Sequence, residues 1–357
     1  MITQPVYATR EDVANAADGK VTARADRRLD RALEQATESV DGLCHRHFAP
    51  TIATRFFDWP NGQYARPWRL WLDANELISV TEVTSEGQVI DPSAVLLEPQ
   101  AYGPPYNRIE LDISTTSGWV GGDTHQRNIG IKGLWGDTDQ QSPLGAATGA
   151  VDTLATRLDV DGETAAEVGV GSIVTLDTER LMVIGRRQAD TGQTLAAEVG
   201  AQAAATTLTV QDGDAFGVGE TVLVDSERMQ IVDIAGPALT VRRGWDGSVL
   251  AAHAASAAVW ASRRLTVRRA VLGTTAAVHP AGTGVRRWDP PALVRQLTIA
   301  EALVSLGLEA AAYTRTVITG SSAGGTGSGT ARDSSGVQDL RDRTYEAHGR
   351  KARLRAV

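Results

Sequence analysis

The sequence contains a single cysteine, Cys44, among its 357 residues. One thiol cannot form an intrachain disulfide, and it excludes zinc sites that need several cysteines. No segment approaches the roughly 20 consecutive apolar residues of a membrane-spanning helix. The opening segment MITQPVYATRED has no basic stretch followed by an apolar run, so we expect no secretory signal peptide and no membrane partner.

Basic charge is also scarce relative to acidic charge. The chain has 35 lysines and arginines against 43 aspartates and glutamates, which gives a net charge of -8. Tight phosphate binding needs a basic surface, so this balance disfavours a protein dedicated to gripping nucleic acid. Hydrophobic residues make up 42% of the sequence, which is enough for packed cores, and the length predicts about two domains.

The sequence lacks the common catalytic signatures. It has no Walker A loop, no GxSxG elbow, no HExxH helix and no dinucleotide fingerprint beside a βαβ unit. Residues 44–47 (CHRH) are a weak zinc signal, which we interpret as a buried cysteine followed by capping histidines. Residues 159–162 (DVDG) lack the remaining ligand spacing of a calcium loop. We therefore expect no enzymatic activity, no cofactor and no bound metal.

Two helices are predicted at the start of the chain, within residues 1–20 and over residues 22–46. Thr9 and Asp12 have the spacing of a capping box at the start of the first helix. The second helix has an apolar stripe at spacings of three and four, formed by Leu29, Leu33, Ala36, Val40 and Leu43. Its other face carries charges of both signs, which are either simply solvated or line a subunit interface. The candidate interface residues are Arg24, Arg27, Arg28, Arg31, Glu34 and Glu38.

Residues 48–143 are predicted to form a small antiparallel β region that packs on the second helix. The aromatic residues of this region are interpreted as core and interface filler. The expected strands are 77–83, 89–90, 95–97, 109–113 and 129–134. Residues 144–155 are rich in small side chains and are predicted to be a linker to a second β-rich region.

The second region contains an internal repeat. Residues 168–184 (VGVGSIVTLDTERLMVI) match residues 216–232 (FGVGETVLVDSERMQIV), and each is predicted to be a β-hairpin around an acidic turn. Residues 239–259 (LTVRRGWDGSVLAAHAASAAV) match residues 265–285 (LTVRRAVLGTTAAVHPAGTGV) at a smaller offset. The repeat therefore has two copies of a first part, 168–184 and 216–232, and two copies of a second part, 239–259 and 265–285. The distance along the chain between the two copies differs for the two parts.

The simplest explanation of the two offsets is nesting. One module is then inserted into a surface hairpin of the other, at about residues 188–262. The alternative is a tandem array with one duplicated tail. Nesting predicts that residues 175–185 share a sheet with residues 264–269.

Several repeated residues could carry chemistry. The repeated acids are interpreted as turn residues rather than cation ligands; they are Asp177, Glu179, Asp225 and Glu227. The repeated histidines, His253 and His279, are expected to hydrogen-bond turn carbonyls.

The end of the chain is predicted to be helical again. Asp289-Pro290-Pro291 starts a helix that extends to about residue 318. Residues 320–336 read as a Gly/Ser linker. A short helix follows, and the chain ends in the basic segment RKARLRAV, which is either a docking arm or a solvated terminus.

The ordered series of segments at the two ends of the chain resembles tailed-phage head-to-tail adaptor proteins, in the form found in actinobacterial phages. The resemblance covers about residues 8–137, the helix 290–318 and the basic tail. The segments that carry it are ATREDVANAADGK, ARADRRLDRALEQATESVDGL, HRHFAP, TRFFDWP, WRLWLD, ISVTEVTSEG, LEPQAYGPPYNRIELD and IKGLWGD.

The resemblance implies a helical connector core built from N- and C-terminal helices. With the small antiparallel β region and the repeats read from the sequence, we expect an α+β fold with an inserted β-rich repeat domain, which is an elaboration beyond the minimal adaptor. The implied divisions are an adaptor core at 1–150, a nested β insertion at 151–288, a core helix at 289–319, a linker at 320–336 and a docking tail at 337–357. Such adaptors form rings, commonly twelvefold, beneath the portal protein at the virion neck after assembly in the host cytoplasm. They extend the channel for double-stranded DNA and dock a stopper, head-closure or tail-terminator protein.

The same resemblance implies that the C-terminal tail contacts the portal. The candidate docking residues are Tyr345, Arg350, Lys351, Arg353 and Arg355. Two alternatives remain open at this point. One is a tail, baseplate or capsid-decorating protein, and the other is a glycan-binding β module that uses Trp245 and Trp260 as stacking platforms.

Overall fold

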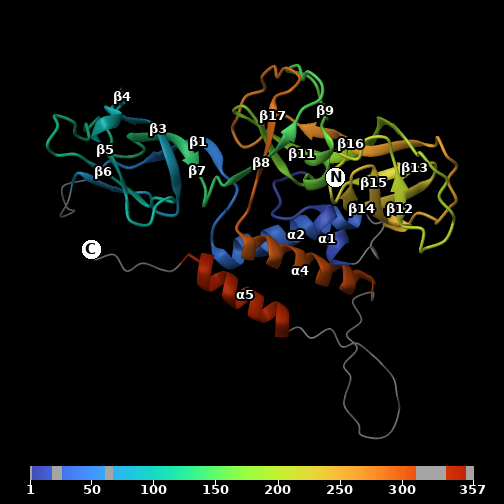
Figure 1. The fold of residues 1–357 in the computed structure, drawn as a ribbon. Coiled ribbons are helices and arrows are strands. Elements are labelled where there is room, and N and C mark those ends of the chain that lie inside the picture. The colour runs from blue at the N-terminus through green and yellow to red at the C-terminus, as the bar shows by residue number, and fades with distance from the viewer. Residues whose placement is uncertain (1, 18–25, 61–66, 311–334, 351–357) are drawn as a thin grey trace, which may run out of the picture.

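The computed structural model describes residues 2–17, 26–60, 67–310 and 335–350. Within these residues the chain is mostly β, with three sheets and only 22% helix. Figure 1 shows the β units side by side, with α1, α2, α4 and α5 gathered on one side of them. The expected helical connector core is therefore wrong.

The helices form a layer rather than a core. This helical layer consists of α1 (Arg10–Ala16), α2 (Asp26–Cys44), α4 (Ala292–Ala310) and α5 (Ser335–His348). The capping box of α1 is confirmed, because Thr9 and Asp12 bond each other's backbone N–H. The apolar stripe of α2 is also confirmed, since it is buried apart from the partly buried Leu43. Among the described residues, no helix is both long and apolar enough to cross a membrane.

The reason the helices do not form a closed bundle lies in what they pack against. Their apolar cluster is shared with residues of the β units, namely Val170, Ile173, Met182 and Trp288. A single stripe on α2 supplies one packing face, and its opposite face stays polar. The β units meanwhile bury three apolar clusters of their own. The two ends of the chain thus cover a β scaffold instead of enclosing a helical core.

The first β unit spans residues 49–136 and contains two small antiparallel sheets. One has the order β1 (Thr51–Phe57), β7 (Ile129–Trp135), β3 (Leu77–Ser85) and β4 (Gln88–Val89). The other has the order β2 (Arg69–Trp71), β6 (Arg108–Leu111) and β5 (Val95–Glu98), with a short 3-10 helix, η2 (Pro92–Ala94), before β5. The five predicted strands are present, whereas β1 and β2 were not predicted.

The remaining strands form one ten-stranded sheet. Its order is β12-β15-β14-β13-β16-β11-β10-β17-β8, and β9 pairs with β16 beside this path. The strands are β8 (Gln141–Ala146), β9 (Arg157–Asp159), β10 (Ile173–Leu176), β11 (Glu179–Thr194), β12 (Thr207–Thr209), β13 (Thr221–Val224), β14 (Glu227–Ala235), β15 (Ala238–Arg242), β16 (Ala258–Arg268) and β17 (Gly284–Trp288). Two short helices accompany them, α3 (Gly162–Glu167) and η3 (Trp245–Gly247).

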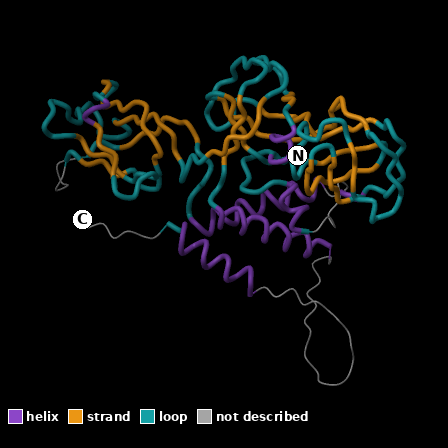
Figure 2. The backbone as a smooth tube through the Cα atoms, viewed as in Figure 1, coloured by secondary structure: helices purple, strands orange, loops and turns teal. Residues whose placement is uncertain are grey.

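The long strands β11 and β16 carry one module within the other. Near the helices Met182 pairs with Arg268, and further along the same ribbon Asp190 pairs with Trp260. This is the pairing that nesting predicts. We call residues 141–187 with 263–288 module 1, and residues 188–262 module 2. Each module has its own apolar cluster, and Figure 2 shows the strands gathered in three groups above the helices.

The predicted linker at residues 144–155 is wrong. Strand β8 pairs with β17 at the edge of module 1, and Val151 is buried and bridges His279. The small residues serve packing here. A Cβ atom at Gly145 would lie 2.1 Å from a carboxylate oxygen of Asp161, so only glycine fits.

Candidate functional site

The predicted interface residues lie on α2, and the chain itself uses several of them. Arg28 forms an ion pair of 2.8 Å with Glu309 at the end of α4. Glu34 accepts hydrogen bonds from the backbone and hydroxyl of Thr3. Glu38 accepts one from the side-chain amide of Gln4 at 3.1 Å. These three residues therefore hold the N-terminal segment and the end of α4 against α2.

The other members of the set differ in position. Arg27 and Arg31 are exposed on α2, while Arg24 lies outside the described residues. An exposed pair of arginines on one helix is available to a neighbouring molecule. The structure thus leaves two of the six predicted residues in a position suited to intermolecular contact.

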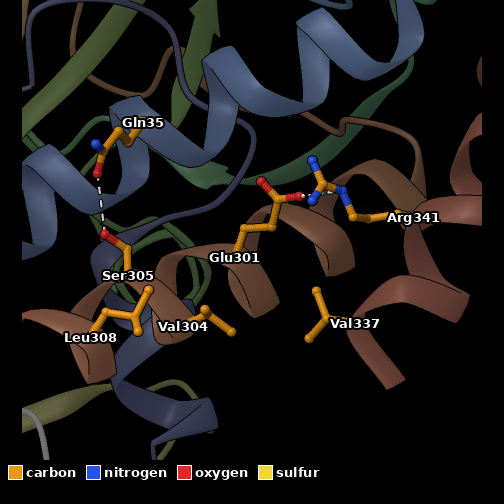
Figure 3. A pocket seen from close by; sticks show the side chains of 7 residues that line it. All are labelled: Gln35, Glu301, Val304, Ser305, Leu308, Val337 and Arg341. Atoms are coloured by element: carbon orange, nitrogen blue, oxygen red, sulfur yellow. Dashed lines mark hydrogen bonds and ion pairs between the residues drawn. The ribbon is translucent and has the colours of Figure 1, made fainter. Parts of the chain in front are cut away.

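A groove lies between α2, α4 and α5 (Figure 3). It encloses about 300 Å³ and is lined by Gln35, Glu301, Val304, Ser305, Leu308, Val337 and Arg341. The polar side chains pair with each other across it: Arg341 lies 3.3 Å from Glu301, and Ser305 donates to Gln35 at 3.1 Å. The lining brings together no nucleophile, base or metal ligand set. Three of the seven lining side chains are apolar, so the groove offers a short apolar strip bordered by polar groups that are already paired.

Helix α4 gives the groove its apolar character. Val304 and Leu308 are 40% and 49% exposed, although they continue a helix whose other side packs on α2. The helix is apolar around much of its circumference, from Leu293 and Val294 to Leu306. Helices of this composition are normally covered on most sides. The exposed strip is therefore the part of the helical layer best suited to contact with another protein.

The predicted docking residues at the C-terminus are only partly described. Tyr345 is 38% exposed on α5. Arg350 is held within the chain, since its N–H donates to the Cys44 carbonyl at 2.9 Å and its guanidinium lies 3.7 Å from Glu76. Lys351, Arg353 and Arg355 lie outside the described residues.

The histidines and cysteine of residues 44–47 do not assemble a metal site. Burial raises the pKa of the Cys44 thiol to about 11, which keeps it protonated and unreactive. His47 lies 2.6 Å from Asp41, and the described residues contain no group of three metal-ligating side chains. Arg46 instead bridges Glu76 and Asp137, and this bridge joins α2 to the first β unit.

The acids of the DVDG segment also have structural partners. Asp159 pairs with Arg157 and Arg264 across β9 and β16. Asp161 caps α3 by accepting from the Thr164 N–H at 2.9 Å. A cation would have to displace these partners.

The repeated acids and histidines meet in a buried network, once in each module. In module 1 the Glu179 carboxylate accepts five hydrogen bonds. Arg269 donates through Nε and Nη2 at 2.7 and 2.6 Å, and His279 Nε2 lies 2.9 Å away. The backbone N–H groups of Ala270 and Ala277 complete the set at 3.1 and 2.9 Å. These contacts tie β11 to a segment about a hundred residues later in the chain.

Module 2 repeats the arrangement with equivalent residues. Glu227 accepts from Arg243 Nε and Nη2, both at 2.7 Å, and lies 3.0 Å from His253 Nε2. The backbone N–H groups of Gly244 and Ala251 each donate to it at 2.9 Å. The same five-bond cage therefore occurs twice in one chain.

Electrostatics explains how two carboxylates stay ionised inside the modules. Burial opposes ionisation, but the hydrogen bonds from arginine, backbone and histidine outweigh it. They lower the pKa of Glu179 and of Glu227 from 4.5 to about 2. The buried charges are thus compensated, as burial of a carboxylate requires.

The interpretation of the repeated residues needs correction. His253 and His279 bind carboxylates rather than turn carbonyls. The acids Asp177 and Asp225 do sit in turns, each with a positive φ of 51°. The sequence signal for the network was the joint repetition of the acids, the histidines and the second arginine of LTVRR, and those arginines, Arg243 and Arg269, were not singled out.

The proposed tryptophan platform does not form. Trp245 is 9% exposed and lies beneath Arg242, whose guanidinium carbon is 5.3 Å from the ring centroid. Trp260 is 40% exposed on β16. Only one of the two rings is therefore available for stacking on a sugar.

Comparison with known proteins identified no relative. No protein-family model, no curated protein and no solved structure matches this chain. The function must be argued from the residues and their geometry.

Proposed function

We propose that this chain is a structural virion protein, a head-to-tail adaptor of a tailed phage. In this proposal it forms a ring beneath the portal, extends the channel for double-stranded DNA and docks the stopper or tail-terminator protein. Its place is the virion neck. The proposal is supported by the ordered resemblance of residues 8–137 and 290–318, and by one feature of the geometry.

That feature is the half-open groove made by helices from both ends of the chain. Helix α2 comes from the N-terminal part, and α4 and α5 come from the C-terminal part. They contact one another as a layer on the β scaffold and do not form the bundle that the resemblance implies. A ring built from heterologous contacts needs two unlike, complementary faces on each subunit. The groove, with Val304 and Leu308 exposed in and beside it, supplies one such face.

The charge of the chain is consistent with this role. A net charge of -8 makes strong attraction to DNA unfavourable on average. A conduit benefits from such a surface, because DNA can slide past without being held. The buried cages in both modules suit β units that must keep their shape under load.

Substitution of Val304 by aspartate tests the role of the groove. Half-burial of a valine contributes about 1 kcal/mol, and a carboxylate in the same place adds a desolvation cost of several kcal/mol. We expect the variant to lose assembly on the portal protein encoded by the same genome, as observed by negative-stain electron microscopy.

Val232→Asp is the matched control, because Val232 is 45% exposed on β14 of module 2. It should assemble as the unmodified chain does. Equal assembly by both variants would remove the groove from the proposal. Failure of the unmodified chain to bind the portal would contradict the adaptor function itself.

A further inference from the structure

The two buried histidines have an unusual hydrogen-bonding requirement. In module 1, His279 Nε2 lies 2.9 Å from a Glu179 oxygen, and its Nδ1 lies 2.7 Å from an Asp177 oxygen. In module 2 the corresponding distances are 3.0 Å from His253 to Glu227 and 2.8 Å to Asp225. Both ring nitrogens of both histidines therefore face carboxylates.

A neutral imidazole cannot satisfy this geometry. It has one N–H donor and one nitrogen lone pair, whereas an ionised carboxylate only accepts hydrogen bonds. One of the two contacts would place a lone pair against a carboxylate oxygen at hydrogen-bond distance. The ring is almost fully buried in both modules, so water cannot mediate that contact.

Charge counting leads to the same result. The groups that face His279 are Asp177 from the β10–β11 turn and Glu179 from β11, and Arg269 after β16 reaches it through Glu179. The neighbouring Asp152 turns its carboxylate to the backbone N–H groups of Leu154 and Ala155. With a charged ring, two cations balance two carboxylates. With a neutral ring, the network carries an excess negative charge, although Asp177 is more than half exposed to water.

The equivalent groups in module 2 are Asp225, Glu227 and Arg243 around His253. Arg228, next to Glu227 in sequence, is occupied by Asp246. The balance of two positive and two negative groups is therefore the same. Because two cages with different surroundings keep the same four residue types, the pairing is a property of the module itself.

We propose that each module is closed by a buried histidine that carries two protons, one donated to the glutamate of the cage and one to the aspartate of the neighbouring turn. The imidazolium links the acidic turn of the hairpin β10–β11 in module 1, or β13–β14 in module 2, to the segment that carries the histidine. In module 1 this link spans the insertion, because residues 177–179 and 269–279 flank module 2 in the sequence.

The test is nitrogen NMR of the full chain labelled with 15N in the histidine rings. An imidazolium has two protonated nitrogens with similar shifts, whereas a neutral ring has one protonated and one unprotonated nitrogen with widely separated shifts. At about pH 8, above the ordinary histidine range, we expect two of the six histidines to keep the imidazolium pattern. Neutral patterns for all six at this pH would overturn the proposal.

Asp177→Asn and Asp225→Asn assign the two signals. These aspartates are more than half exposed, so the variants should fold. An asparagine amide can donate to Nδ1 and thus permits a neutral ring. Each variant should lose the persistent imidazolium signal of its own module and keep the other. Retention of both signals in both variants would contradict the assignment of the second proton to the aspartate contact.

Discussion

Replacing Glu179 with glutamine removes the charge at the centre of the module 1 cage and keeps the size of the side chain. In the unmodified chain this carboxylate receives both arms of Arg269 and two backbone N–H groups. The glutamine has only one acceptor oxygen, and its amide group meets donors. Arg269, which is itself buried, is left beside a neutral group.

Two routes give the size of the effect. The pKa of Glu179 falls from 4.5 to about 2, which corresponds to roughly 3 kcal/mol in favour of the ionised form at about 1.4 kcal/mol per pH unit. Removal of one partner from a buried ion pair costs about 3–5 kcal/mol. Both routes predict that module 1 opens at least roughly 100-fold more frequently in the variant.

Hydrogen exchange with mass spectrometry measures how often module 1 opens. A local measurement is appropriate, because a chain with several cores is not expected to unfold in one step. We expect faster exchange in β10, β11 and β17 of the Glu179→Gln variant and unchanged exchange in module 2. Glu227→Gln should give the mirror image. Glu163→Gln, at an exposed position on α3, is the control for loss of charge alone.

The pH dependence follows from the same lowered pKa. Because the folded state holds Glu179 ionised, its contribution is present above about pH 4.5 and is lost as the pH falls toward 2. The glutamine variant should lack this part of the acid sensitivity of module 1. Protection of module 1 that is the same in the variant and the unmodified chain, at neutral and at acidic pH, would refute the reasoning.

Three further predictions concern contacts between the parts of the molecule. Gly273→Ala should loosen the first β unit from module 1, because the new Cβ would lie 2.0 Å from the Ile52 carbonyl oxygen, and hydrogen exchange in β1 should become faster. Gly247→Ala is the control: it lies at the matching position of module 2, also at positive φ, and should leave exchange in β1 unchanged. Replacing residues 188–262 with a short hairpin turn should leave module 1 folded and protected from hydrogen exchange, because the apolar cluster of module 1 contains no residue of the insertion. Loss of that protection would show that the two modules depend on each other. Tyr7→Phe should lower the free energy of local opening of the helical layer by about 1–3 kcal/mol, because the hydroxyl donates to Asp41 and accepts from a backbone N–H. Hydrogen exchange of the amides in α2 measures this, and unchanged exchange would contradict it.

The periodic elements of the fold were predictable from the sequence. The stripe of α2 and the alternating strands β3 and β7 have the spacing that burial on one side imposes. Strands β1 and β2 were not predictable in this way. The exposed face of β1 carries the apolar Ile52 and Phe56 while Arg55 is half-buried, and β2 has only three residues. A helical core was predicted in place of a β scaffold for a similar reason. The apolar stripe of α2 shows that one face of the helix is covered, and it does not show whether a helix or a sheet covers it.

The nesting could be inferred from the two repeat offsets, since a sequence offset survives insertion. The buried cage could not, because its members are up to about a hundred residues apart and an acidic hairpin turn is by itself a common feature. Its signal was the coincidence of acid, arginine and histidine in both copies. Small residues at 144–155 suggested a linker, although Gly145 is small because Asp161 lies against it.

Labelling of tailed particles tests most directly whether the protein is located in the virion neck. Particles whose genome encodes the chain would be labelled with a gold-conjugated antibody raised against module 2, a β unit with its own apolar cluster. We expect the gold to be confined to the junction between head and tail. Gold along the tail, over the capsid surface or absent from the particles would contradict it.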